Sequence, residues 1–550
     1  MIKSALQIAR ASYQPKLPTV LRGNVKAIEG EITQSMADQE KLKELFSNTY
    51  GLRSVRLEAT DEKTSLPPFN VGVMLSGGQA PGGHNVIAGL FDKLISYNPG
   101  NRLFGILMGP YGMIMHKDIE LTADLIDEYR NTGGFDMLAT SRTKFETEEQ
   151  LEKCLDFAQE LNLKAVVVIG GDDSNTNAAI LAEYFAAHHS GIQVIGVPKT
   201  IDGDVRSEEI EASFGFDTAT KVYSEIIGNI ERDSYSSCKY WHFVRLMGRS
   251  ASHIALECAL QTQPNYCIIS EEVQEKNKSL NDIVTEIATV VAKRAEKGHN
   301  FGVVLIPEGL IEFIPSIGKL IDELNDILSM NTKEFAQKNQ SEIKSIVFAK
   351  LSKENSENYT SLPEKVASQL LFDRDPHGNV QVSKIETEKL ISEMVGSLLK
   401  KWKEEGKYNG KFARQHHFLG YEGRCAAPSN FDSNYCYALG VTASNLILCG
   451  KSAYIAFVGN ITKSCEQQIA GGVPLTKLLD LVYRNGEEQA VIHRTLVNLN
   501  GLPFKKFEAN RDNWAIETAF VYPGPIQFFG PDEICNQPTK SLALEHSKDK

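Results

Sequence analysis

Cysteine is scarce in this chain of 550 residues, and its nine cysteines include no CxxC pair. An odd number of widely spaced cysteines is typical of a reducing compartment, where thiols stay free. We therefore expect no disulfide scaffold, and we expect a cytoplasmic location.

Long hydrophobic runs are also missing. No window of about 18 uncharged apolar residues occurs, so no membrane-spanning segment is expected. The first residues, MIKSALQIARASYQP, lack the apolar run of a secretory signal. The expected protein is soluble and has no membrane partner.

Positive charge is in deficit, because 58 Lys and Arg residues face 70 Asp and Glu residues, for a net charge of −12 and a pI near 5.6. This balance argues against a nucleic-acid partner, since such binding depends on excess positive charge. A local basic pocket for a small anion is still compatible with this net negative charge. The hydrophobic content of 42% is ordinary for a globular chain.

Short apolar runs, each ending in a glycine-rich or polar cluster, dominate the sequence from residue 70 onward. A first set ends in SGGQAPGG, GGDDS and PKTIDGD, and a second set ends in LMGRS, IPEG and GYEGR. Such runs, alternating with helical stretches, indicate parallel strands buried on both faces, with ligand loops at their carboxyl ends. We predict an α/β fold with two Rossmann-like parallel-sheet domains that face each other across an active-site cleft.

The loop Ser76–Gly83 lies between a predicted strand and a predicted helix. Glycines let the backbone approach a ligand closely, and N–H groups at a helix start attract phosphate. The loop is neither a GxGxxG nor a Walker sequence. A tight strand–helix turn without a ligand is an equally good interpretation of this loop alone.

Asp172 and Asp173 follow the next strand. Adjacent carboxylates repel each other unless a cation lies nearby, and Mg²⁺ held by a carboxylate and substrate phosphates would suit them. The alternative is that one of them caps the following helix.

The third cluster combines a cation, a hydroxyl and two carboxylates in Lys199, Thr200, Asp202 and Asp204. A carboxylate next to a sugar hydroxyl can act as a general base while a lysine neutralises phosphoryl charge. The alternative is a solvated turn.

Basic residues at or near predicted strand ends supply candidate anion clamps, because a guanidinium binds phosphate oxygens in pairs. Individually each could be an ordinary surface residue. The candidates are Arg142, Lys144, Arg249 and Arg424. His416 and His417 have no third ligand at metal spacing and are interpreted as packed histidines.

In their order along the chain, these clusters resemble the motifs of the phosphofructokinase family, in particular its long, pyrophosphate-dependent form. The resemblance covers about residues 70–311 and 415–460. It implies reversible phosphoryl transfer from Mg-pyrophosphate to the C1 hydroxyl of fructose 6-phosphate, giving fructose 1,6-bisphosphate and phosphate. Mg²⁺ is the implied cofactor, and these small molecules are the implied partners.

The resemblance also implies a role for each matching residue. Asp202 would be the general base, flanked by Thr200, Ile201 and Asp204, and Asp172 would hold Mg²⁺. The other implied contacts are Gly77, Gly78, Arg142 and Lys199 for the diphosphate, and Met247, Gly248, Arg249, Glu308, Tyr421, Glu422, Gly423 and Arg424 for the sugar phosphate.

Lys239 and Tyr240 match a segment that reaches the sugar site of a neighbouring subunit, which implies a homodimer with shared active sites. Gln415 stands where bacterial ATP-dependent relatives have an arginine that crosses the subunit interface. Phosphate binding across that interface is therefore expected to be weaker or to come from other residues.

Two residues are expected to select the phosphoryl donor. ATP-dependent relatives carry glycine in place of Asp173 and a small neutral residue in place of Lys199. A carboxylate at 173 would repel the α-phosphate of ATP, whereas pyrophosphate ends before that point. The alternatives are an ATP-dependent 6-phosphofructokinase and a non-catalytic regulatory subunit of the family.

The predicted domain division has five parts. These are an N-terminal extension (1–69), a donor-binding domain (70–235 with about 450–520), a sugar-phosphate domain (236–314 and 412–449), a helical insert (315–411) and a C-terminal tail (521–550).

Overall fold

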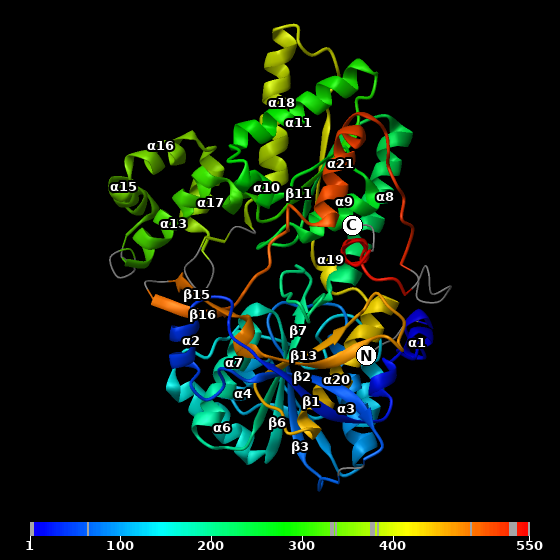
Figure 1. Ribbon diagram of the computed structural model, residues 1–550. Coiled ribbons are helices and arrows are strands. Elements are labelled where there is room, and N and C mark those ends of the chain that lie inside the picture. The colour runs from blue at the N-terminus through cyan, green and yellow to red at the C-terminus, as the bar shows by residue number, and fades with distance from the viewer. Residues whose placement is uncertain are drawn as a thin grey trace.

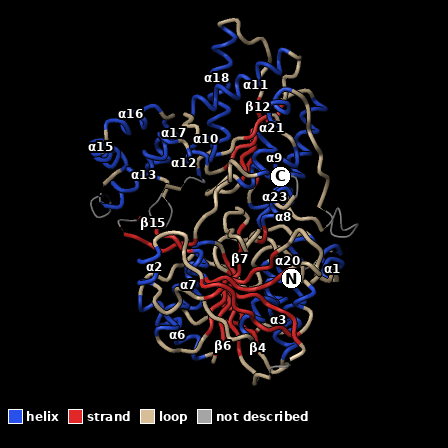
Figure 2. Tube along the Cα trace, in the orientation of Figure 1, coloured by secondary structure: helices blue, strands red, loops and turns tan. Residues whose placement is uncertain are grey.

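A computed structural model describes residues 5–62, 65–330, 335, 338–374, 380–381, 384–484, 487–526 and 536–547. Two separate sheets, each with helices on both faces, form two lobes that lie one above the other in Figures 1 and 2. This arrangement confirms the predicted α/β fold with two parallel-sheet domains. Within the described residues, no helix has the length and apolar character that crossing a membrane requires.

The larger sheet is parallel at its centre and antiparallel at both edges. Its central strands are buried apolar runs, as the sequence predicts. In order, its strands are β1 (Asn24–Ile32), β2 (Arg53–Thr60), β14 (Ile469–Pro474), β13 (Tyr454–Gly459), β7 (Gln193–Thr200), β6 (Leu163–Gly170), β3 (Asn70–Leu75), β4 (Arg102–Ile106) and β5 (Asp118–Glu120), with β8 (Phe214–Gly215) paired to the end of β7.

Helices cover both faces of this sheet. Buried clusters join α3 (Gly83–Tyr97) and α20 (Asn430–Leu448) to one face, and α6 (Glu148–Glu160) and α7 (Asp172–Ala187) to the other. The remaining short elements of this lobe are α1 (Ala5–Ala11), η1 (Thr19–Leu21), α2 (Gln39–Leu45), α4 (Pro110–Ile114), α5 (Ala123–Tyr129) and η3 (Leu475–Leu478).

The smaller sheet consists of four parallel strands, in the order β10 (Tyr266–Cys267), β11 (Gly302–Pro307), β9 (Trp241–Leu246) and β12 (Arg414–Leu419). One face packs on α8 (Phe216–Ser237) and α9 (His253–Thr262), the other on α11 (Leu280–Glu296) and α18 (Thr387–Glu404). The same buried cluster contains residues from both sheets, so the lobes share a hydrophobic core. The other elements here are α10 (Ser270–Glu275), α12 (Leu310–Phe313), α19 (Tyr421–Arg424), α21 (Leu502–Ile516) and α23 (Lys540–Glu545).

The N-terminal extension contains helix α2, which begins directly after Asp38 and ends at Leu45. The extension also contributes β1 and β2, which the sequence analysis did not predict. Along β2 the buried and exposed residues alternate, with Val55 and Leu57 pointing inward. Such alternation is typical of an edge strand with one solvated face.

The insert is helical, as predicted. Helices α13 (Pro315–Met330), α15 (Gln340–Lys350), α16 (Lys353–Ser361) and α17 (Glu364–Phe372) form a group at the side of the molecule (Figure 1). The polar stretch Lys353–Ser361 is itself helical. Ser352 caps α16 by accepting a hydrogen bond from Asn355, and Tyr359 is buried against the insert core.

Helix α20, assigned from the sequence to the sugar-phosphate domain, lies on the larger sheet against α3. Glycines allow the close contact, because a Cβ at Gly89 would lie 2.2 Å from the carbonyl oxygen of Tyr437, and one at Gly440 would lie 2.0 Å from that of Val86. A helix pair held this closely by small residues has no local sequence signal.

Two C-terminal segments also differ from the expected division. Helix α21, placed from the sequence with the donor domain, packs on the smaller lobe, where the Arg294 side chain donates to the carbonyl oxygen of Ile516 at 2.8 Å. Part of the expected surface tail forms α23, whose first backbone N–H groups, of Lys540 and Ser541, donate to the Glu257 carboxylate at 2.9 and 2.8 Å.

Candidate active site

Loops from both sheets meet between the lobes, and each follows the carboxyl end of a strand. The larger sheet contributes the loops after β3, β6 and β7, and the smaller sheet those after β9, β11 and β12. Two close approaches join loops of the two lobes at this junction, which we call the cleft. A Cβ on Gly78 would lie 2.9 Å from an Arg424 terminal nitrogen, and one on Gly248 would lie 3.9 Å from Asp202 Oδ1. The predicted motifs therefore converge on one site.

The loop after β3 requires glycine at its first turn. Gly77 has φ +78°, a conformation that other residues adopt with strain. Its N–H donates to the carbonyl oxygen of Ser141 at 2.9 Å, and Ser76 forms a β-bridge with the same residue. This pairing ties the glycine loop to the segment that carries Arg142.

Lys199 lies between two glycine turns. A Cβ on Gly77 would lie 3.6 Å from its Nζ, and one on Gly171 would lie 3.7 Å from it. The side chain is 5% exposed. Burial and then the positive charge of Arg424 lower the pKa of Lys199 to about 8, against the opposing charges of Asp172 and Asp202. A cation in such a cradle is suited to contact a small polyanion.

Four aspartates lie in the loops after β6 and β7, near this lysine: Asp172, Asp202, Asp204 and Asp173. Asp204 is buried, and its burial, followed by the charges of Asp202 and Asp172, raises its pKa to about 8. The fourth, Asp173, forms an ion pair with Lys144 at 3.5 Å. Cations already stabilise two of these carboxylates, because Lys144 pairs with Asp173 and Arg494 pairs with Asp172.

Neither acidic residue of the second loop is the helix cap that was considered from the sequence. Helix α7 begins at Asp172 itself, and Gly171 is its N-cap residue. Asp172 and Asp173 therefore lie in the first turn, where the helix dipole favours negative charge. Burial raises the pKa of Asp172, but Arg494, the Asp173 backbone N–H and Lys199 outweigh it and leave this pKa below its ordinary value.

Asp202 has an unused hydrogen-bond acceptor. Its backbone N–H donates to Thr200 Oγ1 at 3.0 Å, which fixes the turn, and Ile201 beside it is buried. Its buried Oδ1 has no hydrogen-bond partner among the described residues. A buried carboxylate oxygen without a donor is costly, so a ligand hydroxyl would fill a real deficit here.

The smaller sheet supplies the wall that carries Arg249 and Glu308. Gly248 donates its N–H to Glu308 Oε2 at 3.1 Å, and burial raises the pKa of Glu308 above its ordinary range. A Cβ on Gly309 would collide with the carbonyl oxygen of Arg249, so the loops after β9 and β11 are in direct contact. Met247 packs beneath them and is 6% exposed.

The loop after β12 forms the short helix α19. Tyr223 donates its hydroxyl hydrogen to the carbonyl oxygen of Gly420 at 2.5 Å, and its ring fills the space beside Gly423. Glu422 accepts the N–H of Gly420 at 3.2 Å. Tyr421, by contrast, is 68% exposed, so this chain alone does not cover it.

Lys239 and Tyr240 do not lie with the other site residues. They precede β9 and therefore lie at its amino end, roughly 20 Å from Met247 at the rise of a strand. Both are exposed, and Tyr240 adopts a left-handed φ of +66°. A site contact by these residues would have to be made in another subunit.

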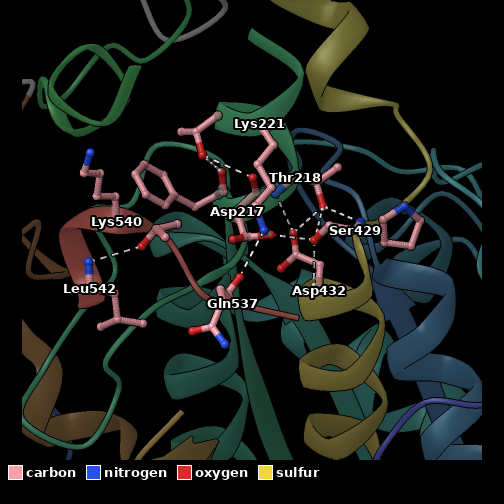
Figure 3. Close-up of polar contacts among 12 residues, drawn as sticks. Asp217, Thr218, Lys221, Ser429, Asp432, Gln537, Lys540 and Leu542 are labelled. Carbon is pink, nitrogen blue, oxygen red and sulfur yellow. Dashed lines mark hydrogen bonds and ion pairs between the residues drawn. The ribbon is translucent and has the colours of Figure 1, made fainter. Parts of the chain in front are cut away.

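A buried polar cluster supports the site from behind (Figure 3). Asp432, at the start of α20, accepts the N–H groups of Gly215 and Thr218 at 3.1 and 2.9 Å. Gly215 pairs with Thr200, so these bonds reach the loop that carries Asp202. Burial, followed by the charge of Asp217, raises the pKa of Asp432 to about 7.

Arg494 is a site residue that the sequence analysis missed. It follows β16 (Glu487–Ile492), the second strand of a hairpin with β15 (Leu479–Arg484), and its Nε donates to Asp172 Oδ2 at 2.5 Å. No motif marks it, because it stands in the unremarkable sequence HRTL, 322 positions from its partner. A lone arginine in such a context gives no sequence signal.

The donor set fits Mg²⁺ only if a ligand supplies most of the coordination. No group of three or more His, Cys, Asp or Glu side chains that could hold a metal occurs in the described part of the chain. Asp172 and the neighbouring carboxylates offer oxygen ligands, which Mg²⁺ combines with water and substrate phosphates. His416 and His417 contact Ser392 and His242 at 2.7 and 2.9 Å and are packed histidines, as predicted.

Comparison with known proteins agrees with this geometry. The family model described as Phosphofructokinase matches residues 70–447. The chain is 57% identical to the pyrophosphate--fructose 6-phosphate 1-phosphotransferase of Porphyromonas gingivalis, over 99% of each chain, and 51% identical to that of Entamoeba histolytica over 100% of each.

A solved structure has the same fold at much lower identity. The pyrophosphate-dependent phosphofructokinase from Nitrosospira multiformis superposes with a TM-score of 0.55 at 16% identity, covering 86% of this chain and 96% of its own. The family match spans more than half of the chain and contains every strand-end loop of the cleft. On these grounds the chain belongs to the phosphofructokinase family.

Proposed function

We propose that this protein transfers a phosphoryl group from pyrophosphate to the C1 hydroxyl of fructose 6-phosphate, giving fructose 1,6-bisphosphate and phosphate. It is an enzyme, a diphosphate--fructose-6-phosphate 1-phosphotransferase, as its full-length relatives are named. The observation that carries the proposal is the position of Lys199 Nζ between Gly77 and Gly171. The next residues along the chain are Gly78 and Asp172, respectively. A buried ammonium group beside two glycine turns suits a small polyanion such as a diphosphate.

The larger sheet binds the donor. The diphosphate lies at the Gly77–Gly78 turn, where the Gly77 N–H is bound to Ser141 and the Gly78 N–H is the donor toward a phosphate oxygen, and Lys199 and Arg142 neutralise the phosphate charge. Phosphoryl transfer depends mainly on such positioning and charge neutralisation, because the protein forms no covalent bond in the step. The low pKa of Lys199 means that its charge is already partly destabilised and that an anion restores it.

The smaller sheet binds the sugar phosphate. Met247, Gly248 and Arg249, with Glu308, hold the sugar, and the segment Tyr421–Arg424 binds its 6-phosphate end. The contact of Gly248 with both Glu308 and the neighbourhood of Asp202 supports this position for C1.

Asp202 is the general base. It takes the proton from the C1 hydroxyl as that oxygen attacks the near phosphorus, the bridging P–O bond breaks, and its electron pair stays on the departing phosphate. The buried Oδ1 without a donor supports this role. Thr200 and Asp204 flank the base and hold the turn.

Mg²⁺ is the cofactor that this chemistry needs, and Asp172 would hold it together with oxygens of the diphosphate. When bound, it supplies further neutralisation of phosphate charge. After burial, the charges of Asp202 and Asp172 raise the pKa of Asp204, and a divalent ion would relieve this part of the shift, which supports a cation here.

Asp173 rejects ATP in this proposal. A carboxylate in the first turn of α7 stands where a longer chain of phosphates would continue past the diphosphate, and like charge there is repulsive. The enzyme acts as a cytoplasmic homodimer in which Lys239 and Tyr240 reach the sugar site of the partner. Their exposure and distance from Met247 support this arrangement.

An assay with purified protein tests the proposal. At fixed fructose 6-phosphate and Mg²⁺, pyrophosphate should support turnover and ATP should not. Turnover with ATP alone would favour the ATP-dependent alternative, and binding of sugar phosphate without turnover on either donor would favour a regulatory subunit.

A further inference from the structure

Arg494 lies beside the donor site although it belongs to none of the family's motifs and follows the matching region, which ends at residue 447. Its Nε donates to Asp172, and the side chain remains 34% exposed. Within the described residues, neither terminal nitrogen of the Arg494 guanidinium donates a hydrogen bond to a protein acceptor. Two N–H-bearing atoms are therefore available to a ligand in the cleft.

The cations of the cleft form two groups. Arg142 is influenced by the like charges of Arg249 and Arg424, so these three lie together. Arg494 is instead influenced by Asp172, Asp173 and Asp204, and these charges outweigh burial and raise its pKa. The two groups are adjacent, because Arg142 is also influenced by Asp173 and Asp202, and Glu312 is influenced by both Arg249 and Arg494. Arg494 differs from the others in its direct pairing with Asp172 at the acidic end of the donor site.

A short segment, residues 492–497, holds Arg494 in this position by bonding to both lobes. On the larger lobe, Ile492 donates its N–H to Thr176 Oγ1 at 3.0 Å and Thr495 donates to the carbonyl oxygen of Asp204 at 2.8 Å. On the smaller lobe, the carbonyl oxygen of Thr495 is 2.8 Å from His253 Nε2.

The end of the same segment is anchored to the smaller lobe as well, since Val497 donates its N–H to Glu271 at 3.0 Å. In Figure 1 the chain rises here from the β15–β16 hairpin to α21. The side chain between these anchors is therefore held in place by backbone bonds rather than by its own contact alone.

We propose that Arg494 binds the distal phosphate of pyrophosphate, the one that departs, and binds free phosphate in the reverse reaction. This inference rests on the proposed function. The transferred phosphoryl must lie near Asp202, so the acidic end at Asp172 adjoins the other phosphate. A guanidinium there pairs with two phosphate oxygens and offsets the charge that the departing group acquires when the bridging bond breaks.

The test compares Arg494→Gln and Arg494→Lys with wild type. For Arg494→Gln, the KM for pyrophosphate, and for phosphate in reverse, should rise about tenfold to a hundredfold, the range for losing charge-assisted hydrogen bonds. The KM for fructose 6-phosphate should change by less than about twofold, and lysine should restore part of the loss because it keeps the charge but not the fork. The rise in Tm on adding pyrophosphate should shrink, while the rise on adding fructose 6-phosphate should persist.

His493→Gln is the matched control, since this neighbour pairs with Asp480 on the β15 side of the segment. It should leave both KM values unchanged. The inference is overturned if Arg494→Gln keeps the wild-type response to pyrophosphate, or if it weakens both substrates equally, as general disruption of the segment would. Absence of pyrophosphate turnover in wild type would instead refute the proposed function, which separates the two failures.

Discussion

The two walls of the cleft differ in charge, although both bind phosphate groups in the proposed reaction. The wall built on the larger sheet holds Asp172, Asp173, Asp202 and Asp204 around Lys199. The wall built on the smaller sheet is formed by the loops of Arg249 and Arg424, with Glu308 as its buried acid.

The difference follows from the chemistry of the ligands. A diphosphate that arrives with a divalent cation needs carboxylates as well as cations, whereas a sugar phosphate needs mainly guanidinium groups. Each of the following predictions changes one wall and leaves the other as an internal control.

The largest effect is expected at the base. Asp202→Asn should lower kcat by ~10²–10⁴, because an amide cannot accept the C1 proton. Binding of both substrates, measured by ligand-induced rises in Tm, should remain. Near-normal turnover in this variant would mean that another group removes the proton.

Donor choice should respond at Asp173 and Lys199. Lys199→Gln should lower kcat/KM for pyrophosphate about tenfold to a hundredfold, since a buried charge-assisted contact is lost. Asp173→Gly should allow ATP to act as a donor by removing the repulsive carboxylate. Parallel assays with both donors measure the change, and an unchanged preference in Asp173→Gly would contradict the repulsion argument.

The sugar wall should respond independently of the donor wall. Arg249→Gln should raise the KM for fructose 6-phosphate about tenfold through loss of charge-assisted hydrogen bonds from the guanidinium to the sugar. The KM for pyrophosphate should change little. Equal changes in the two constants would show that the walls are not separable.

The pH profile should report Lys199. Its pKa of about 8 means that the free enzyme loses this positive charge as pH rises through 8, so kcat/KM for pyrophosphate should fall on the alkaline side. The fall in kcat/KM is expected on the alkaline side because it is the protonated, positively charged form of Lys199 that binds the anion. Steady-state kinetics from pH 6.5 to about 9.5 measure the profile, and Lys199→Gln should lack this alkaline limb.

The smallest effect concerns stability. The pKa of Asp204 is raised from 3.8 to about 8, so the folded state holds a proton there that the unfolded chain releases. Its contribution to the free energy of unfolding is full below pH 4 and is lost as pH rises to 8. Asp204→Asn should therefore flatten the decline of Tm between these pH values, and thermal melts at several pH values measure the slope. An equally steep decline in the variant would contradict the shifted pKa.

Much of the fold could be predicted from local sequence. The central strands contain buried apolar runs, such as Ala165–Ile169 in β6, which ends at Gly170. Edge strands were missed, because the alternation in β2 spans only a few residues and lies in a polar extension. Helix α16 was missed for a related reason, since its polar sequence buries mainly one large ring, that of Tyr359.

The candidate site divides in the same way. Residues in the loops after β3, β6, β7, β9, β11 and β12 could be found because strand, turn and functional group are contiguous in sequence. Arg494 could not be found, because its function in the inference above depends on a partner far along the chain. The support that Asp432 gives to Gly215 was equally invisible, for the same reason.

The sequence by itself determined the alternation of strands and helices, the glycine turn at Gly77 and the chemistry at each strand end, because these depend on backbone preferences and on neighbours a few residues away. Only the tertiary structure decided that α20 packs on the larger sheet, that Lys199 is buried between two glycine turns and that Arg494 meets Asp172. These outcomes depend on how distant segments pack together, and the free energy of that packing is a property of the whole chain and not of any local stretch.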